Sequence, residues 1–248
     1  MINPCEFVTC RNVKLSEETL SRHYNMLLLI TESYLDHMFF GTALPRITDL
    51  YKAIGISSRA GDKILDRLEC CWRYIICERS QRNRYKCYPT YMGLIAIYSK
   101  PEYYNKLREY LLTHHCKDPS DNECIRILDE FALYDDRHKL ILSLFKNVDD
   151  LKALIDDLRT SILNNEVFRN AVNEYLAGFL SNEEVRKRLI TQLRLPSTAS
   201  TSDIVNKLLD SLVNDDVARA EMDIVIFRWL MRALPLIADT YLISLLWA

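Results

Sequence analysis

The stretch from Ile47 to Pro89 constrains the fold more than any other part of the chain. Its apolar residues form two runs at helical spacing, first Leu50, Ala53 and Ile54, then Ile64, Leu65 and Leu68. Gly55 lies between the runs, and glycine adopts a positive φ without a Cβ clash. Ser57 or Ser58 can cap the second run. The pattern therefore predicts a helix, a tight turn and a second helix.

Two runs rich in β-branched and aromatic residues follow, from Arg73 to Arg79 and from Arg84 to Tyr88. The polar, turn-prone residues 80–83 between them predict a β-hairpin. Pairing Arg79 with Tyr85 would then place Glu78 opposite Lys86, and Cys77 opposite Cys87. Cross-strand Cβ atoms lie about 4.5–5.5 Å apart, so Cys77 and Cys87 are a candidate disulfide. Two buried thiols are the alternative.

Helix, turn, helix and hairpin is the order of elements in a winged helix. Residues 20 to 100 resemble winged helix-turn-helix DNA-binding domains, particularly small bacterial and archaeal repressors. The resemblance rests on three motifs, YKAIGIS at Tyr51–Ser57, ILDRLE at Ile64–Glu69 and TYMG at Thr90–Gly93. In that family they lead into the recognition helix, close it, and start the helix after the wing. The resemblance implies a homodimeric transcriptional regulator that binds double-stranded DNA at half-sites about one helical turn apart.

The resemblance also implies which residues contact DNA. The candidates are Ser57, Ser58, Arg59, Lys63 and Arg67 on the recognition helix, and Arg79, Arg82, Arg84 and Lys86 near the tip of the wing. Arg59 could contact guanine in the major groove, and the serines could hold phosphate. The alternative is an ordinary solvated helix face, because Asp62 and Asp66 beside these residues would repel phosphate.

Charge is unevenly distributed along the chain. The formal net charge is -2, yet residues 46–88 hold ten Lys and Arg against five Asp and Glu, whereas residues 89–248 hold 19 against 24. Attraction to phosphate needs a local patch of positive charge, because screening confines the electric field of a charge to about 8 Å at physiological salt. The basic excess coincides with the predicted winged helix.

The rest of the chain is predicted to be helical, since it has only 5 Gly and 7 Pro. Residues 1–19 read as an arm and 19–40 as the first helix of the fold. Further helices are expected over 90–99, 103–115, 123–133, 136–145, 149–163, 166–180, 183–193, 203–212, 216–234 and 237–247. Pro196–Ser202 is the most linker-like stretch, and Pro235 should kink or end its helix.

We therefore expect a mostly α protein with two domains. Residues 1–100 would form the winged helix-turn-helix with its arm, and residues 101–248 an all-α domain for dimerisation or for binding a protein partner. The candidate interface residues are Phe227, Trp229, Leu230, Tyr241, Leu245 and Trp247. The final 25 residues are apolar, but charges at 228, 232 and 239 interrupt them, so a membrane anchor is not expected.

The N-terminus lacks the features of a signal peptide, which predicts a cytoplasmic protein. Its 8 cysteines would then be free thiols, or disulfides if the source is a hyperthermophile. His114, His115, Cys116 and Cys124 invite a zinc hypothesis, but the paired CxxC spacing is absent and we expect no metal or cofactor.

No Gly-rich phosphate loop, HExxH or GxSxG motif occurs, so an enzyme is not expected. The competing hypothesis is an interaction or scaffold protein that uses its winged helix to bind another protein. The overall acidity of the chain and the acids of the recognition helix favour this alternative.

Overall fold

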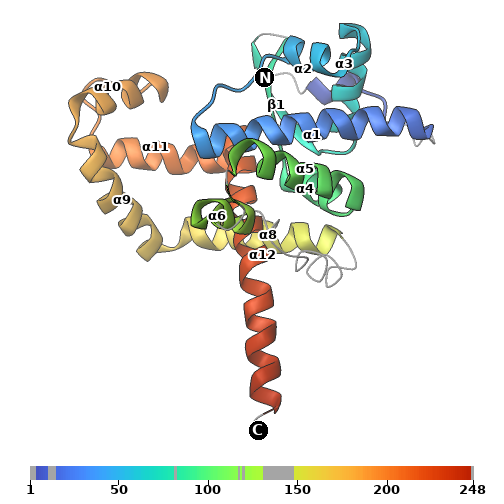
Figure 1. The fold of residues 1–248 in the computed structure, drawn as a ribbon. Helices are drawn as coiled ribbons and strands as arrows, with labels where there is room; N and C mark the ends of the chain where they lie inside the picture. Colours follow the sequence, from blue (N-terminus) through green and yellow to red (C-terminus); the bar gives the residue numbers. More distant parts are fainter. Residues whose placement is uncertain are drawn as a thin grey trace. The chain divides into compact units, whose positions relative to one another are not determined.

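The computed structural model describes residues 4–10, 15–80, 83–116, 118, 121–130 and 148–246. These residues are mostly helical and include a small two-stranded antiparallel sheet (Figure 1). The chain divides into two compact units, unit 1 with residues 1–146 and 227–248, and unit 2 with residues 147–226. The division differs from the expected boundary at residue 100, because it keeps residues 101–130 with the N-terminal elements.

Unit 1 begins with a short 3-10 helix and a long helix. Its elements are η1 (Pro4–Phe7), α1 (Glu17–Phe40), α2 (Ile47–Ile54), α3 (Ser58–Asp66), the π-helical turn η2 (Arg67–Cys71), β1 (Ile75–Ser80), β2 (Asn83–Pro89), α4 (Tyr91–Tyr98), α5 (Pro101–His115) and α6 (Asn122–Glu130). The second part of α12 (Asp216–Leu246) also belongs to it. Ser16 caps α1, and Gly41 ends it in the left-handed conformation.

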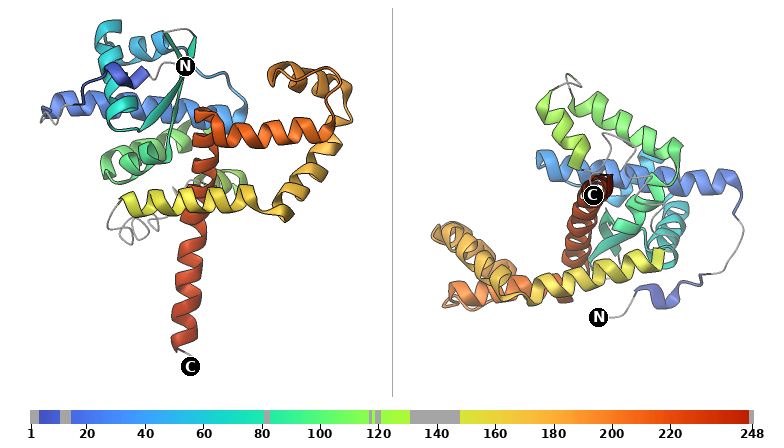
Figure 2. Two further views of the ribbon diagram at one scale, coloured as in Figure 1. Left: turned by 180° about the vertical axis from the view of Figure 1, so that it is seen from behind. Right: turned by 90° about the horizontal axis from the view of Figure 1, so that it is seen from below.

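The core of unit 1 is built around α1. Figures 1 and 2 show α1 between α2 and α3 on one side and α4 and α5 on the other, and α1 also contacts β2. The largest fully buried side chains are Met26, Leu27, Ile30, Leu35, Leu65, Leu68, Ile75, Leu94, Ile97, Leu107 and Phe227. They come from nearly every element of the unit, so its helices and its hairpin share one apolar core.

The turn between α2 and α3 follows the sequence prediction. Gly55 has a φ of 72° and ends α2, and Ser57 caps α3 by accepting a hydrogen bond from the Ala60 amide at 3.4 Å. A Cβ at Gly61 would lie 2.3 Å from the Tyr51 ring. The two helices therefore approach each other closely, and a glycine is needed at that contact.

Unit 2 contains α8 (Val148–Asn164), α9 (Glu166–Leu180), α10 (Glu183–Gln192), α11 (Thr201–Asn214) and the start of α12. Two small apolar clusters hold it together, one around Leu163, Val205 and Leu209, the other around Leu180, Ala199 and Ile204. The stretch read as most linker-like is largely exposed, but Ala199 within it is buried and Ser200 forms a capping box with Asp203 at the start of α11.

Two expectations about the last helix can be compared with the structure. α12 continues through Pro235, where a kink or an end was predicted, so the missing backbone N–H does not end this helix. Among the candidate interface residues, Phe227 and Leu230 are buried, whereas Trp229 is 58% exposed. The side chains of Tyr241 and Leu245, residue Trp247, and the predicted helix over 136–145 lie outside the described part of the chain.

Candidate nucleic-acid interface

Two rows of opposite charge run along α3 and η2. The cations are Arg59, Lys63 and Arg67, and the acids are Asp62, Asp66 and Glu69. Members of each row are three or four residues apart, and residues at that spacing share a helix face. The charges that are mixed in the sequence are therefore sorted into two faces.

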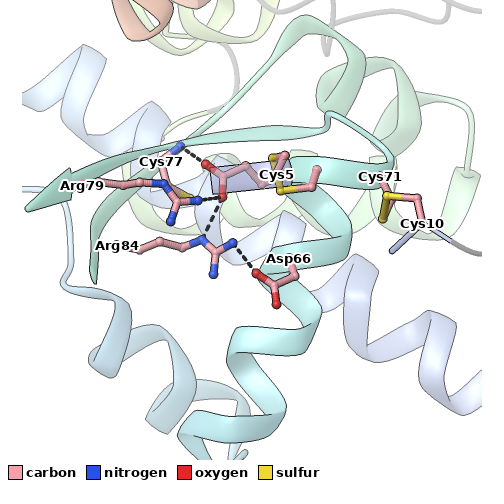
Figure 3. The surroundings of a disulfide bond; sticks show 9 residues. Cys5, Cys10, Asp66, Cys71, Cys77, Arg79 and Arg84 are labelled. Carbon is pink, nitrogen blue, oxygen red and sulfur yellow. Dashed lines mark hydrogen bonds and ion pairs between the residues drawn. A yellow bond between two sulfur atoms is a disulfide. The ribbon is translucent and has the colours of Figure 1, made fainter. Parts of the chain in front are cut away.

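The first two acids are bound to side chains from other elements. Asp62 accepts a hydrogen bond from the hydroxyl of Tyr51 on α2, at 2.7 Å. Asp66 accepts one from Nη2 of Arg84 on β2, at 2.6 Å (Figure 3). The acids that would repel phosphate thus connect α3 to α2 and to the hairpin.

Glu69 is the most enclosed of the acids, with 8% of its side chain exposed. Its carboxylate accepts hydrogen bonds from Nε of Arg84 at 2.8 Å, from Arg79, and from the backbone amide of Cys77 at 3.3 Å (Figure 3). A carboxylate this buried needs several donors, because burial opposes the charged form. Glu69 therefore fixes the hairpin to the end of α3.

These contacts shift the pKa of several groups. Burial opposes the charge of Arg84, but the bonds to Asp66 and Glu69 outweigh burial and raise its pKa. Burial lowers the pKa of Arg79, and the attraction of Glu69 offsets only part of that change. Burial and the bond to Asp62 raise the pKa of Tyr51. The acids of α3 and η2 thus favour the charged form of Arg84 and offset part of the cost of burying the charge of Arg79.

The side chains of Arg79 and Arg84 do not face solvent as expected for a wing tip. They are 20% and 10% exposed and point toward Glu69. Lys86 is half-buried, and Arg82 lies outside the described residues. Of the four wing cations proposed as DNA contacts, two are thus committed to ion pairs within the protein.

The hairpin register is also different near the tip. Cys77 pairs with Cys87 and Glu78 with Lys86, as predicted, but Arg79 pairs with Arg84 rather than with Tyr85. Tyr85 is therefore an extra residue in β2, which is a β-bulge. The bulge turns Arg84 toward α3 and leaves Tyr85 46% exposed. Sequence alternation could not predict it, because a bulge breaks the period of two.

All eight cysteines are paired in four disulfides. Cys77 and Cys87, the candidate pair, have their sulfurs 1.97 Å apart across the hairpin. Cys116 and Cys124 join the end of α5 to α6, with sulfurs 2.07 Å apart. The zinc hypothesis would need thiolate ligands from these two cysteines, and the disulfide leaves neither as a thiolate. His115 instead lies with Nε2 at 2.7 Å from a carboxylate oxygen of Asp36.

The other two disulfides fix the N-terminal arm to η2. Cys5 bonds Cys70 and Cys10 bonds Cys71, with sulfur distances of 2.06 and 2.15 Å (Figure 3). These adjacent cysteines belong to the same π-helical turn that carries Glu69. The end of α3 is therefore held by the arm through covalent bonds and by the hairpin through ion pairs.

The cations of α3 have a different environment. Ser57, Ser58, Arg59 and Lys63 are exposed at the N-terminal half of the helix. Within the described part of the chain, neither Arg59 nor Lys63 forms an ion pair. Arg67 is half-buried, close enough to His23 of α1 to lower the pKa of that imidazole, although burial is the larger cause. The exposed part of the row therefore consists of Arg59 and Lys63.

Tyr51, Asp66 and Glu69 belong to the site but were not predicted from the sequence as members of it. The spacing of the acids was a usable signal, because acids at i, i+4 and i+7 share a helix face. Their partners could not be deduced, since the bulge at Tyr85 decides where Arg84 points. Across the described residues, no cluster of three or more His, Cys, Asp or Glu is arranged to hold a metal ion.

Comparison of the chain with protein-family models, with curated proteins and with solved structures finds no match. Over the described residues, no helix has both the length and the apolar character required to cross a membrane. The geometry of α3 and the hairpin is therefore the basis for any functional conclusion.

Proposed function

We propose that the chain is a sequence-specific DNA-binding protein, a transcriptional regulator whose α1–α4 and hairpin form a winged helix. The observation that supports this proposal is the sorting of charge on α3. Arg59 and Lys63 are exposed, while Asp62, Asp66 and Glu69 are bound to Tyr51, Arg79 and Arg84. The recognition helix thus presents Arg59 and Lys63 to a duplex, while Asp66 and Glu69 are paired with arginines of the hairpin and the exposed Asp62 is bonded to Tyr51.

The proposed contacts follow from position on α3. The first turn of a recognition helix enters the major groove, where an arginine can make two hydrogen bonds to guanine. Arg59 occupies that turn, and Lys63 lies one turn further along, where it would contact a phosphate. Ser57 already uses its hydroxyl as the helix cap, so Ser58 is the serine available to phosphate.

Dimerisation is part of the proposal. Trp229 on α12 is 58% exposed, which is unusual for a large aromatic side chain and favours a protein contact there. A two-fold dimer would place two copies of α3 on half-sites about one helical turn apart.

Duplex binding tests the proposal. Electrophoretic shift and fluorescence anisotropy should show binding that weakens steeply between two salt concentrations. Arg59→Ala should cost about 1–3 kcal/mol at a selected site and relax sequence choice, because it removes a base contact. Lys63→Ala should weaken binding to all sequences and reduce the salt slope by about one.

Arg188→Ala provides the matched control, since Arg188 is an exposed arginine of unit 2. A parent protein that ignores duplex at low salt, or an Arg59→Ala variant with unchanged affinity and selectivity, would contradict the proposal.

Binding of a protein partner is the second candidate, and the hairpin favours it. Arg79 and Arg84 are neutralised by Glu69 and Asp66, so the hairpin contributes less positive charge than its sequence suggests. Under this alternative the exposed face of α3 would contact an acidic protein surface. A parent that binds no duplex at either salt concentration supports this alternative.

A further inference from the structure

The hairpin exposes an aromatic ring, whereas two of its cations are bound within the protein. Its bulge is the reason, because Tyr85 has no partner on β1 while Arg84 and Lys86 pair with Arg79 and Glu78. Bulges commonly re-aim a side chain next to a functional site. Here the bulge sends Arg84 toward Glu69 and leaves the Tyr85 ring 46% exposed.

The contacts of Tyr85 within the described residues indicate no structural role for its exposed side chain. Within the described residues, its hydroxyl makes no hydrogen bond and its ring packs against no other ring. Over the face of the ring lies a cation, Nζ of Lys86, 5.6 Å from the ring centroid. An exposed tyrosine beside a lysine combines a stacking surface with a positive charge.

Lys86 is available to an anion. The residue opposite it, Glu78, accepts a hydrogen bond from the hydroxyl of Tyr88, and no ion pair joins Lys86 to Glu78 within the described residues. The ring and the ammonium group therefore come from consecutive residues, and each can meet a different part of one nucleotide.

We propose that Tyr85 and Lys86 form the hairpin's contact to duplex DNA. The ring would pack against a deoxyribose at the edge of the groove beside α3, and the ammonium group would contact the adjoining phosphate. The inference rests on the proposed DNA binding of this chain, and it assigns to Tyr85 the contact that Arg79 and Arg84 cannot make. Contacts to sugar and phosphate carry no sequence information, so this contact strengthens binding without selecting sequence.

The test compares side chains at position 85 in the full-length, oxidised protein, with a random-sequence duplex and fluorescence anisotropy. Tyr85→Phe keeps the ring and should bind as the parent does. Tyr85→Ala and Tyr85→Leu remove it and should weaken binding by roughly 2- to 13-fold, the range for one lost aromatic contact. Because tyrosine is uncharged, the salt slope should stay the same in all three variants, whereas Lys86→Ala should lower it by about one.

Tyr175→Ala is the matched control, because Tyr175 is a 69% exposed tyrosine in unit 2. Thermal melts should show that Tyr85→Leu and Tyr85→Ala fold like the parent, since the side chain is exposed. If the parent binds duplex, and Tyr85→Ala and Tyr85→Leu bind it as tightly as the parent does, the inference is wrong while the proposed function stands. Equal losses in Tyr85→Phe and Tyr85→Ala would also overturn it, because the hydroxyl would then carry the contact. A parent that binds no duplex overturns both proposals.

Discussion

Units 1 and 2 are both mostly helical, yet different interactions stabilise them. All eight cysteines and the Glu69 network belong to unit 1. Unit 2 has no cysteine, and its helices begin at local side-chain caps such as Asn165, Asn182 and Ser200. Unit 1 is thus fixed by four disulfides and the buried Glu69 network, whereas unit 2 has caps, small apolar clusters and one buried long-range ion pair, Arg159 with Asp223.

This difference predicts which changes should lower the free energy of unfolding of each unit most. Interactions across long loops restrict the unfolded chain strongly, so their loss should be costly for unit 1. Caps act within one turn and contribute about 1 kcal/mol each, so unit 2 should respond weakly to any one of them. The tryptophans make the comparison measurable, because residues 72, 229 and 247 all belong to unit 1. Tryptophan fluorescence follows unit 1, whereas circular dichroism follows both units.

Removal of both arm disulfides should have the largest effect. The two disulfides have sequence separations of 65 and 61. Whichever forms first closes a loop of more than 60 residues and contributes about 4 kcal/mol in the chain-entropy model. The second then closes a loop of only a few residues and adds about 2 kcal/mol. Urea unfolding followed by tryptophan fluorescence should show a loss of about 6 kcal/mol when all four cysteines are serine, and about 2 kcal/mol when one pair is. A loss below 1 kcal/mol for the fourfold variant would break the comparison.

Glu69→Ala should destabilise unit 1 by about 3–5 kcal/mol, because it leaves Arg79 and Arg84 buried without Glu69. Glu184→Ala is the control in unit 2, where the ion pair with Arg188 is 74% exposed on both sides. That variant should change the free energy of unfolding by less than about 0.5 kcal/mol. Similar losses in the two variants would show that burial does not decide how much an ion pair contributes to stability.

Glu32→Gln should stabilise unit 1 in a pH-dependent way. Burial, and then the nearby charge of Asp36, raise the pKa of Glu32 from 4.5 to about 7. The protonated carboxyl therefore favours the folded state below pH 4.5, and this stability is lost as the pH rises through 7. The variant should gain about 3 kcal/mol at pH 8 and nothing at pH 4. An equal effect at both pH values would rule out titration of Glu32 as the cause.

Ser200→Ala should have the smallest effect, about 1 kcal/mol, because it removes the capping box of α11. Ser200→Thr retains a hydroxyl and should lose less. Circular dichroism should detect the change without a shift in the tryptophan transition, if unit 2 unfolds separately. A matching shift in tryptophan fluorescence would mean that the units unfold together.

The sequence predicted the features that depend on short periods. Helical spacing located α1 to α4, and Gly55 and Ser57 marked the turn and the cap because both act through their own backbone. The bulge at Tyr85 was missed, since a single inserted residue leaves no periodic signal. The pairing of Cys5 with Cys70 and of Cys10 with Cys71 was not foreseen, because cysteine spacing does not determine connectivity.

The disulfides also bear on the environment of the protein. Stable disulfides are typical of oxidising compartments, and of intracellular proteins from hyperthermophiles. Four disulfides therefore fit an oxidising compartment or a hyperthermophilic source.

The adjacent cysteines of η2 have a practical consequence for anyone who shortens the chain. A fragment that begins at Leu15 lacks Cys5 and Cys10, so Cys70 and Cys71 would be left as neighbouring thiols. Such thiols attack the disulfide of oxidised glutathione, which releases reduced glutathione, and a thiol of a second copy can then displace the bound glutathione to form a disulfide between the copies. Covalent dimers on a non-reducing gel would then report the missing arm and not a native assembly. During oxidative refolding of the whole chain, the same neighbours could also exchange partners and trap an isomer in which Cys5 holds Cys71.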